Sequence, residues 1–398
     1  MRIIQINSFF NSGGPPRIVQ GIYNTLEEQG HSCVLAACRE RPIAGMNIIK
    51  IGSPLNKYVH CIMTRLFDSE GLSSVHATKE LIKKIKAYKP DVIQLHNLHG
   101  YYINYEILFK FIKETNVSVV WTLHDCWAFT GHCAYFDYIA CEKWKSGCYN
   151  CPQKKNYPKS VLLDCSKRNY QKKMESFCNV KNMSIVTPSH WLADLTKKSF
   201  LREYPIEVIH NGIDLNVFKP SQGSFREKHN LKEKFIVLGV AQVWDERKGL
   251  DYFIKISKTL NNDFKVVLVG LSDKEKSKLP SNIIGINRTN NVRELVEIYT
   301  EADVFVNPTL EDNFPTTNLE ALACGTPVIT FHTGGSIESV NHNCGIVVEK
   351  GDLQGLENAI LKISKQNISR ITCISQAKNY EKKSRYDQYI RLYQQIII

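Results

Sequence analysis

The stretch VFVNPTLEDNFPTTNLEALACGTPVITF (304–331) decides the fold of this chain. It begins with a short apolar run, Val304–Asn307, passes through an acidic loop and continues into a helical segment, Thr316–Ala323. Gly325 ends that helix, and a second β-branched run, Val328–Phe331, follows it. A strand, a helix and a further strand in this order are typical of parallel strands joined by crossover helices.

The same alternation extends over the rest of the chain. Near the start, β-branched runs at Ile3–Asn7 and Ser32–Ala37 flank a helix from about Pro16 to Gln29, and the pattern restarts after about residue 220. Because 398 residues exceed the usual size of one core, the sequence predicts two doubly wound α/β domains. The expected parts are an N-terminal Rossmann-like domain (1–205), a C-terminal one (206–380) and a final helix that packs back on the first domain (381–398).

The acidic loop and the helix after it carry residues that point to chemistry. Thr316, Thr317 and Asn318 open the helix with free backbone N–H groups, which suit an anion. Asp312 and Glu320 lie eight residues apart and can accept hydrogen bonds from two different sets of sugar hydroxyls. Acids near a helix start also complement its dipole, which would explain Asp312 better than Glu320.

Two other predicted strand exits carry candidate ligand groups. Arg247 and Lys248, within VWDERKG (243–249), follow a strand and precede a helix, where two adjacent cations suit a diphosphate. Gly13 and Gly14 follow the first strand and allow a ligand to approach the backbone closely. They do not form the G-x-G-x-x-G fingerprint, which argues against a nicotinamide-dependent oxidoreductase. Taken by itself, the Arg247–Lys248 pair is explained equally well as solvated surface cations. The Gly13–Gly14 pair is explained equally well as a tight turn.

Five of the thirteen cysteines gather in a predicted insertion at about residues 124–160. Cys133, Cys141, Cys148 and Cys151 follow the spacing C-x7-C-x6-C-x2-C, whose last element matches the short loop of a structural zinc site. Reduced, buried cysteines explain the cluster as well, since a free cysteine packs as a small hydrophobe. The first residues read as a strand and not as a signal peptide, so we expect a cytoplasmic protein without a disulfide framework.

Charge is distributed unequally along the chain, which carries +12 in total. Residues 1–181 hold 24 basic and 14 acidic side chains, a net of +10, whereas residues 182–398 hold 27 and 25, a net of +2. A basic half suggests an anionic partner, either nucleic acid, a membrane surface or a phosphorylated substrate, although solvated lysines give the same count. No paired-histidine zinc finger or helix-turn-helix signal supports nucleic acid. No apolar run reaches the ~18 residues that span a bilayer.

Several segments together resemble the retaining glycosyltransferases of family 4, which have the two-domain GT-B fold. The stretch 304–331 is similar to the Glu-x7-Glu region of that family, and RKG (247–249) to its phosphate-binding turn. VIHNGIDLNVFKP (208–220) resembles the interdomain junction, and NIIGINRTNNVRELVEIYTEADVFVNPT (282–309) the nucleotide pocket. HDCWAFTGHCAYF...CEKWKSGCYNCPQ (124–153) is similar to a bacterial subgroup that builds exopolysaccharides such as colanic acid, and O-antigens.

The resemblance implies roles for residues in the C-terminal domain. It assigns Glu320 to the ribose hydroxyls of a nucleotide and Asp312 to hydroxyls of the transferred sugar, with Glu311 taking that role if the loop is shifted by one. Arg247 and Lys248 would neutralise the diphosphate, assisted by the amides that open the Thr316 helix. The usual Gly-Arg-Leu before the phosphate turn is absent, so Arg247 would replace the missing cation.

In the N-terminal domain, His124 matches the family histidine that faces the donor sugar and the reaction centre. A lone histidine is often structural, but Asp125 beside it and its place after a strand favour function. Gly13 and Gly14 are also expected to contact the donor. The expected reaction needs no divalent metal, and the sequence identifies no covalent nucleophile.

The expected activity is the transfer of a sugar, with retention, from a UDP- or GDP-sugar to a glycan or lipid-linked oligosaccharide. Exopolysaccharide, O-antigen or lipopolysaccharide synthesis would use such an enzyme. We expect the protein at the inner face of the cytoplasmic membrane, where the basic half meets anionic lipids, and we expect no nucleic acid partner. A nucleotide-sugar epimerase or hydrolase of the same fold is the alternative enzyme, and a basic nucleic-acid-binding protein is the alternative from another class.

Overall fold

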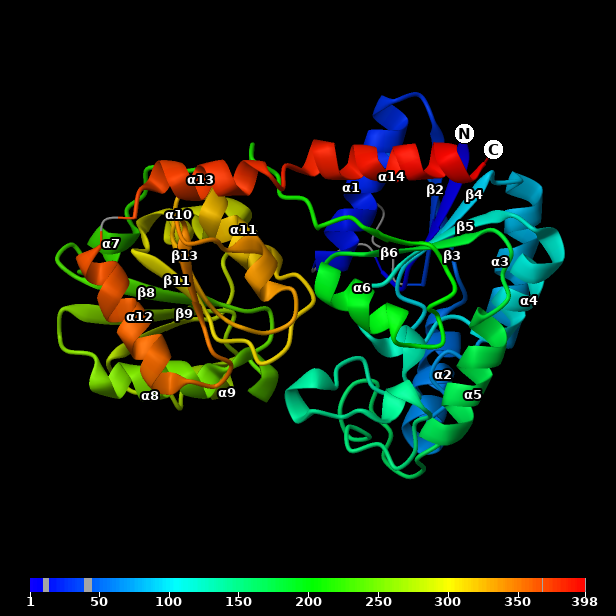
Figure 1. Cartoon of the computed structure of the whole chain (residues 1–398), viewed down its shortest axis with the longest axis horizontal. Helices are drawn as coiled ribbons and strands as arrows, with labels where there is room; N and C mark the ends of the chain where they lie inside the picture. Colours follow the sequence, from blue (N-terminus) through cyan, green and yellow to red (C-terminus); the bar gives the residue numbers. More distant parts are fainter. Residues whose placement is uncertain (10–13, 39–44, 367, 398) are drawn as a thin grey trace. The chain divides into compact units, whose positions relative to one another are not determined.

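The computed structural model describes residues 1–9, 14–38, 45–366 and 368–397 (Figure 1). The chain divides into two compact units, each built on its own parallel sheet. The first unit comprises Met1–His210 and Arg385–Ile398, and the second comprises Asn211–Ser384. The chain therefore enters the second unit once and returns to the first through its last helix.

Within the described residues, the sheet of the first unit has the strand order β3-β2-β1-β4-β5-β6-β7, and every neighbouring pair is parallel. Its strands are β1 (Arg2–Ile6), β2 (Ser32–Ala37), β3 (Ile48–Lys50), β4 (Val92–Leu95), β5 (Ser118–Thr122), β6 (Met183–Thr187) and β7 (Ile206–Val208). Its helices are α1 (Gly14–Glu28), α2 (Pro54–Phe67), α3 (Val75–Tyr88), α4 (Tyr105–Thr115), α5 (Ser166–Phe177) and α6 (His190–Lys197), and α14 (Lys382–Ile396) joins them from the end of the chain. The strand order reverses between β1 and β4, which is where doubly wound sheets bind ligands.

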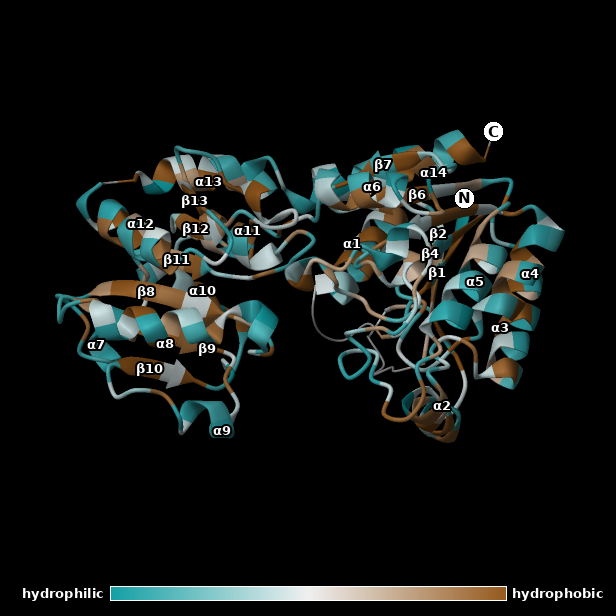
Figure 2. Ribbon diagram, turned by 60° about the horizontal axis from the view of Figure 1, so that its bottom comes forward, coloured by the Kyte–Doolittle hydropathy of each residue, from teal (hydrophilic) through white to brown (hydrophobic). Residues whose placement is uncertain are grey.

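Successive residues of the central strand enter cores on opposite faces of the sheet. Ile3 belongs to a core with α1 and α14, whereas Ile4 belongs to a second core with α3, α4 and α5. Both side chains are fully buried. This burial on both faces explains why the strands read as mostly apolar runs, and Figure 2 shows them largely in the hydrophobic colour.

In the second unit, the described strands have the order β10-β9-β8-β11-β12-β13, again with parallel neighbours. They are β8 (Phe235–Val240), β9 (Phe264–Val269), β10 (Ile283–Ile286), β11 (Val304–Asn307), β12 (Val328–Phe331) and β13 (Gly345–Val348). The helices are α7 (Phe225–Lys228), α8 (Leu250–Thr259), α9 (Asp273–Lys276), α10 (Val292–Glu301), α11 (Thr316–Ala323), α12 (Leu353–Lys365) and α13 (Arg370–Lys378). The order reverses between β8 and β11, so the loops that follow these two strands lie at the switch point.

Candidate active site

The turn after β8 is held in a conformation that requires glycine. A short 3-10 turn, η4 (Glu246–Lys248), is capped by Asp245, whose carboxylate accepts a hydrogen bond from the Lys248 amide at 2.9 Å. The next residue, Gly249, has a φ of +76°. A Cβ atom there would lie 2.3 Å from the carbonyl oxygen of Pro308, so only glycine fits between the turn and the loop after β11.

Backbone hydrogen bonds tie this turn to the loop after β11. The Leu310 amide donates to the carbonyl oxygen of Arg247 at 2.7 Å, and the Arg247 guanidinium donates to the carbonyl oxygen of Glu311 at 2.6 Å. Two loops that are about sixty residues apart in the chain thus form one surface at the switch point.

On this surface, Asp312 lies between two cations. Its Oδ2 atom accepts a hydrogen bond from Lys248 Nζ at 2.5 Å and lies 4.0 Å from Arg247 Nη1. The three side chains are 15–23% exposed. Burial alone would raise the pKa of Asp312, but Lys248 and Arg247 hold it below its ordinary value. A second carboxylate, Asp245, lies 3.8 Å from Arg247 Nη2, so two carboxylates balance the two cations. The cations bring N–H donors to this surface that can bind an anion.

The register of the loop distinguishes Asp312 from Glu311. Glu311 is fully buried, whereas Asp312 is the carboxylate that meets the cations. Gly334, in the loop after β12, has a φ of +52°, and a Cβ atom there would lie 1.9 Å from the carbonyl oxygen of Asp312. Gly335 donates to that same oxygen at 3.1 Å. Sequence reasoning missed this glycine pair, although it lies in the loop that follows a predicted strand.

Helix α11 begins beside the loop that holds Asp312. Pro315 precedes it without a side-chain cap, and Thr316 and Thr317 are half-buried. The prediction that the Asn318 amide would be free is wrong, because it donates to the Pro315 carbonyl oxygen at 3.2 Å. The Asn318 side chain is buried and donates to Ser336 and Ser339 at 3.2 and 3.1 Å. The sequence could not reveal these partners, which come from the loop after β12.

Glu320 lies on α11 with only 3% of its surface exposed. Its Oε2 atom accepts a hydrogen bond from the hydroxyl of Tyr299, which is fully buried on α10. This contact fixes one oxygen of the carboxylate. Sequence reasoning did not identify Tyr299, because an aromatic residue in a helix gives no signal of its polar partner.

In the first unit, His124 follows β5 and pairs with a second histidine. Its Nε2 atom lies 3.0 Å from Nδ1 of His96, and Nε2 of His96 lies 3.1 Å from the Gln5 side-chain oxygen. Burial lowers the pKa of His124 to about 4 and lowers that of His96 well below its ordinary value. Both rings are therefore neutral at pH 7. Sequence reasoning missed His96, which directly follows a predicted strand.

Asp125 belongs to a neighbouring hydrogen-bonded set. Its Oδ2 atom lies 2.8 Å from Nε2 of His99, and Nδ1 of His99 lies 2.7 Å from the hydroxyl of Tyr157. Burial alone would raise the pKa of Asp125, but His99 and the amide of Trp127 hold it below its ordinary value. The loops that follow β4 and β5 thus place an acid and three imidazole rings at one edge of the sheet, and Tyr157 from further along the chain joins them.

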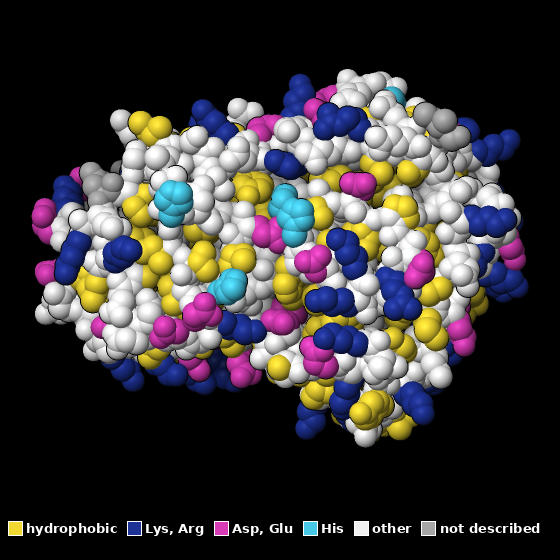
Figure 3. All heavy atoms as spheres, in the orientation of Figure 1, with side chains coloured by type: hydrophobic (Ala, Val, Ile, Leu, Met, Phe, Trp, Pro, Cys, Tyr) yellow, Lys and Arg dark blue, Asp and Glu magenta, His cyan; other side chains and the backbone are white. Residues whose placement is uncertain are grey.

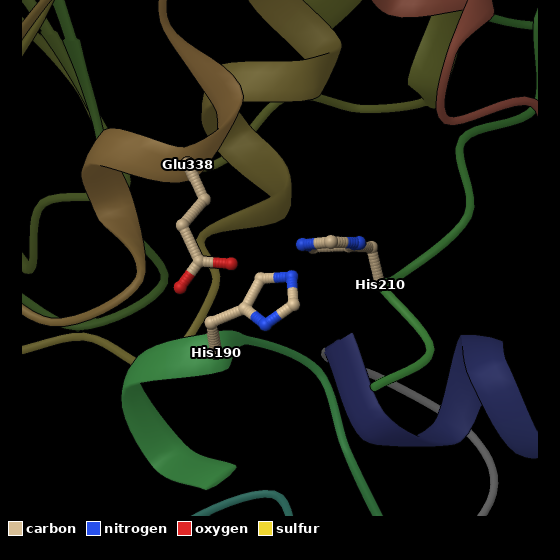
Figure 4. A group of neighbouring side chains, drawn as sticks. All are labelled: His190, His210 and Glu338. Atoms are coloured by element: carbon tan, nitrogen blue, oxygen red, sulfur yellow. The ribbon is translucent and has the colours of Figure 1, made fainter. Parts of the chain in front are cut away.

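The remaining predicted residues of the first unit are less informative. Gly13 lies outside the described residues. Gly14 is the first residue of α1. A Cβ atom there would meet nothing within 4 Å, so a larger residue would also fit at this position. Figure 4 shows two further histidines of this unit, His190 at the start of α6 and His210 at the end of the segment Met1–His210. Their ring centroids are 5.7 Å apart.

The four cysteines of the predicted zinc set lie together in the first unit. Cys133, Cys141, Cys148 and Cys151 line one small pocket between β5 and α5. Each has a free thiol. Cys133 is buried and the other three are half-buried.

Comparisons with known proteins agree with this architecture. The family described as Glycosyltransferase Family 4 matches residues 12–217, more than half of the chain, and the family described as Glycosyl transferases group 1 matches residues 221–380. The putative colanic acid biosynthesis glycosyl transferase WcaC of Escherichia coli K12 is 23% identical over the full length of both chains.

Two further matches bear on the site. The N,N'-diacetylbacillosaminyl-diphospho-undecaprenol alpha-1,3-N-acetylgalactosaminyltransferase of Campylobacter jejuni is 25% identical over 52% of this chain and 58% of its own. The solved structure of Anabaena Alr3699/HepE in complex with UDP-glucose superimposes with a TM-score of 0.70 and 14% identity, over 99% of this chain and 100% of that one. With parallel sheets in both units and both family regions present, the chain is a glycosyltransferase that belongs to glycosyltransferase family 4.

Proposed function

We propose that this glycosyltransferase moves a sugar from a nucleotide-diphosphate sugar to a hydroxyl of a bacterial surface glycan, with retention of the anomeric configuration. The observation that carries the proposal is the cluster of Lys248, Arg247 and Asp312 at the switch point of the second unit. Its two cations suit a diphosphate, and its carboxylate suits sugar hydroxyls.

Breaking the bond between the sugar and the phosphate creates charge on both fragments. Negative charge grows on the diphosphate, so the groups that stabilise the leaving group lower the barrier most. Lys248, Arg247 and the amides of Thr316 and Thr317 supply this stabilisation. Asp312 holds Lys248 in position and accepts hydrogen bonds from the sugar, and Glu320, oriented by Tyr299, accepts them from the ribose.

On the acceptor side, we propose a lipid-linked glycan. The Campylobacter relative is named for an undecaprenol-diphosphate sugar, and WcaC for colanic acid. His124 and His96 are neutral, so they can exchange hydrogen bonds with sugar hydroxyls without adding charge. The role of His124 is to orient the transferred sugar.

A screen of nucleotide sugars tests the donor side. We expect one donor class to raise the midpoint of thermal unfolding, because a ligand at a hundred times its dissociation constant stabilises a protein by about 2.7 kcal/mol. UDP-sugars are the first class to test, since the Anabaena neighbour was solved with UDP-glucose. GDP-sugars with the same hexose serve as the matched comparison.

The active donor is then supplied with radiolabelled sugar and a lipid-diphosphate acceptor. Label that moves to the acceptor supports a transferase. Label recovered only as free sugar, or as an epimerised nucleotide sugar, contradicts the proposal and supports the hydrolase or epimerase alternative. The absence of any shift with both donor classes would contradict the nucleotide-sugar assignment itself.

We also propose that the first unit docks on an anionic membrane surface through α2 and the segment 161–163. On α2, the exposed side chains include Leu55, Tyr58, Val59 and Ile62, which recur at helical spacing. Figure 2 shows this helix largely in the hydrophobic colour. In the described chain, no helix has both the length and the apolar character needed to cross a membrane. An amphipathic helix with its apolar face outward fits the plane of a bilayer surface instead.

The segment 161–163 extends this apolar face. The amide of Val161 donates to the Arg65 carbonyl oxygen at 2.6 Å, and that of Leu163 to the Leu66 carbonyl oxygen at 3.2 Å. Val161, Leu162 and Leu163 are 48–60% exposed. Exposed cations flank both segments: Arg65, Lys155, Lys159, Lys167 and Arg168. Figure 3 shows basic and hydrophobic side chains intermixed on this part of the first unit. Such a mixture favours anionic lipid over a purely apolar partner.

Vesicle binding tests this surface. We expect the wild-type protein to sediment with phosphatidylcholine vesicles that contain phosphatidylglycerol, and less with phosphatidylcholine alone. The double variant Tyr58→Glu/Ile62→Glu should bind at least about tenfold more weakly, because two apolar side chains no longer enter the interface.

Ile371→Glu is the matched control, since Ile371 is 77% exposed but lies on α13 of the second unit. It should bind like the wild type. Equal binding to neutral and anionic vesicles, or an unchanged affinity of the double variant, would contradict the docking surface.

A further inference from the structure

The segment between β5 and α5 is a lobe with little regular structure of its own. Its described residues form three short 3-10 turns, η1 (Trp127–Phe129), η2 (Asp137–Ile139) and η3 (Lys143–Lys145). A segment of this length without helices or strands needs another source of order, and small irregular lobes often obtain it from a metal or from disulfides. The buried rings of Phe129, Phe136 and Trp144 pack on one another and supply part of it. Every cysteine has a free thiol, so disulfides do not contribute.

Four cysteines converge inside this lobe. Cys133, Cys141, Cys148 and Cys151 line the same pocket, together with the aromatic rings of Phe136 and Trp144. Cys133 and Cys151 lie near enough for their thiols to influence one another. Four thiols with this degree of convergence are more than packing against a core requires, since a single cysteine fills a small apolar gap by itself.

A backbone amide approaches the sulfur of Cys148 closely. The amide of Gly131 donates a hydrogen bond to Cys148 Sγ at 3.1 Å. A Cβ atom on Gly131 would lie 2.6 Å from Cys148 Cβ and 2.1 Å from the Ser166 carbonyl oxygen, so only glycine permits this approach. Amide hydrogen bonds to sulfur are the contacts that support thiolate ligands around metals.

A buried cation lies next to the cluster. Lys173 is 1% exposed, and its Nζ donates to the Trp127 carbonyl oxygen at 2.6 Å and lies 3.4 Å from the centre of the Trp127 ring. Burial lowers the pKa of Lys173 to about 7, and negative charge on Cys148 and Cys133 opposes that shift. A Zn²⁺ ion with four thiolates has a net charge of −2, so a buried ammonium beside it lowers the cost of burying that charge.

We propose that Cys133, Cys141, Cys148 and Cys151 bind one structural Zn²⁺ ion in tetrahedral geometry, with Lys173 as a buried counter-charge. No three of these sulfur atoms lie within 4.8 Å of one another in the described structure, so binding turns the side chains inward around the pocket. Each thiol loses its proton to solvent as its Zn–S bond forms. The site lies within the first unit and is independent of the donor groups in the second.

The metal content of the purified full-length protein tests the proposal. We expect about one zinc per chain by mass spectrometry, released when a mercurial reagent titrates the thiols and detected with a chromogenic chelator. Cys148→Ser and Cys151→Ser should each lower the zinc content at least about tenfold. Cys178→Ser is the matched control, because Cys178 is a half-buried cysteine outside the lobe, and it should keep the metal.

Cobalt substitution keeps the test valid if the serine variants fail to fold. Wild-type protein loaded with Co²⁺ should show the sulfur-to-metal charge-transfer and ligand-field bands of tetrahedral thiolate coordination. Zinc below about 0.1 per chain, together with four thiols that react at once with a thiol reagent in the folded protein, would overturn the site. Iron in place of zinc would also overturn it. Because the readout is metal content and absorption, neither result depends on which sugar donor is used.

Discussion

Replacing Lys248 by methionine is expected to lower kcat/KM for glycosyl transfer by about 10²-fold to 10³-fold. Methionine keeps most of the length and apolar volume of the lysine stem but removes the charge that meets the diphosphate. Loss of one preorganised group at a developing negative charge costs about this much in other enzymes. Initial rates with varied donor concentration give the value.

The control for this variant is Lys258→Met, which changes an exposed lysine on the neighbouring helix α8 and should leave kcat/KM unchanged.

The variant Asp312→Asn tests whether the 2.5 Å contact between Lys248 and Asp312 matters for catalysis. Since Asp312 holds Lys248 in place, the double variant should lose less activity than the product of the two single losses. Wild-type rates for Lys248→Met, or strictly multiplicative losses, would contradict the role of this pair.

Most strands of both sheets could be predicted, because a buried parallel strand is marked by a run of apolar residues in its own sequence. Val92–Leu95, Phe235–Val240 and Val304–Asn307 are apolar except for Gln94 and Asn307, and the observed strands have these same bounds. The sequence does not predict the edge strands β3, β7 and β13. They are short and only partly buried, so their sequence pattern is weak.

The contacts within the candidate site were less accessible to sequence reasoning. Spacing placed Lys248 and Asp312 after two different strands, but their ion pair depends on which strands become neighbours, and the reversal between β8 and β11 decides that. The same holds for His96, which meets His124 only because β4 and β5 pair. Local pattern therefore predicts which loops carry ligand groups, whereas strand order determines which groups meet.

Replacing Tyr393, a residue of the final helix α14, is expected to lower the stability of the first unit strongly. Tyr393 on α14 is fully buried, and its hydroxyl donates to the side-chain oxygen of Gln94 at 2.8 Å. The Gln94 amide in turn donates to Thr122 at 2.9 Å. Burial raises the pKa of Tyr393 well above its ordinary value, so the phenol stays protonated and remains a donor. The end of the chain thus completes both the core and a buried polar network of the first unit.

Tyr393→Ala is therefore expected to lower the free energy of unfolding of the first unit by about 3–5 kcal/mol, because it leaves a large cavity. Tyr393→Phe should cost about 1–3 kcal/mol, since it keeps the ring but leaves the Gln94 oxygen without its donor. Tyr58→Ala is the control: Tyr58 is 66% exposed, and its loss should change stability by less than about 0.5 kcal/mol. Urea unfolding followed by fluorescence measures all three. If Tyr393→Ala unfolds at the wild-type midpoint, α14 does not belong to the core of this unit. If the phenylalanine and alanine variants lose equal stability, the hydrogen bond, and not the ring, accounts for the contribution of this residue.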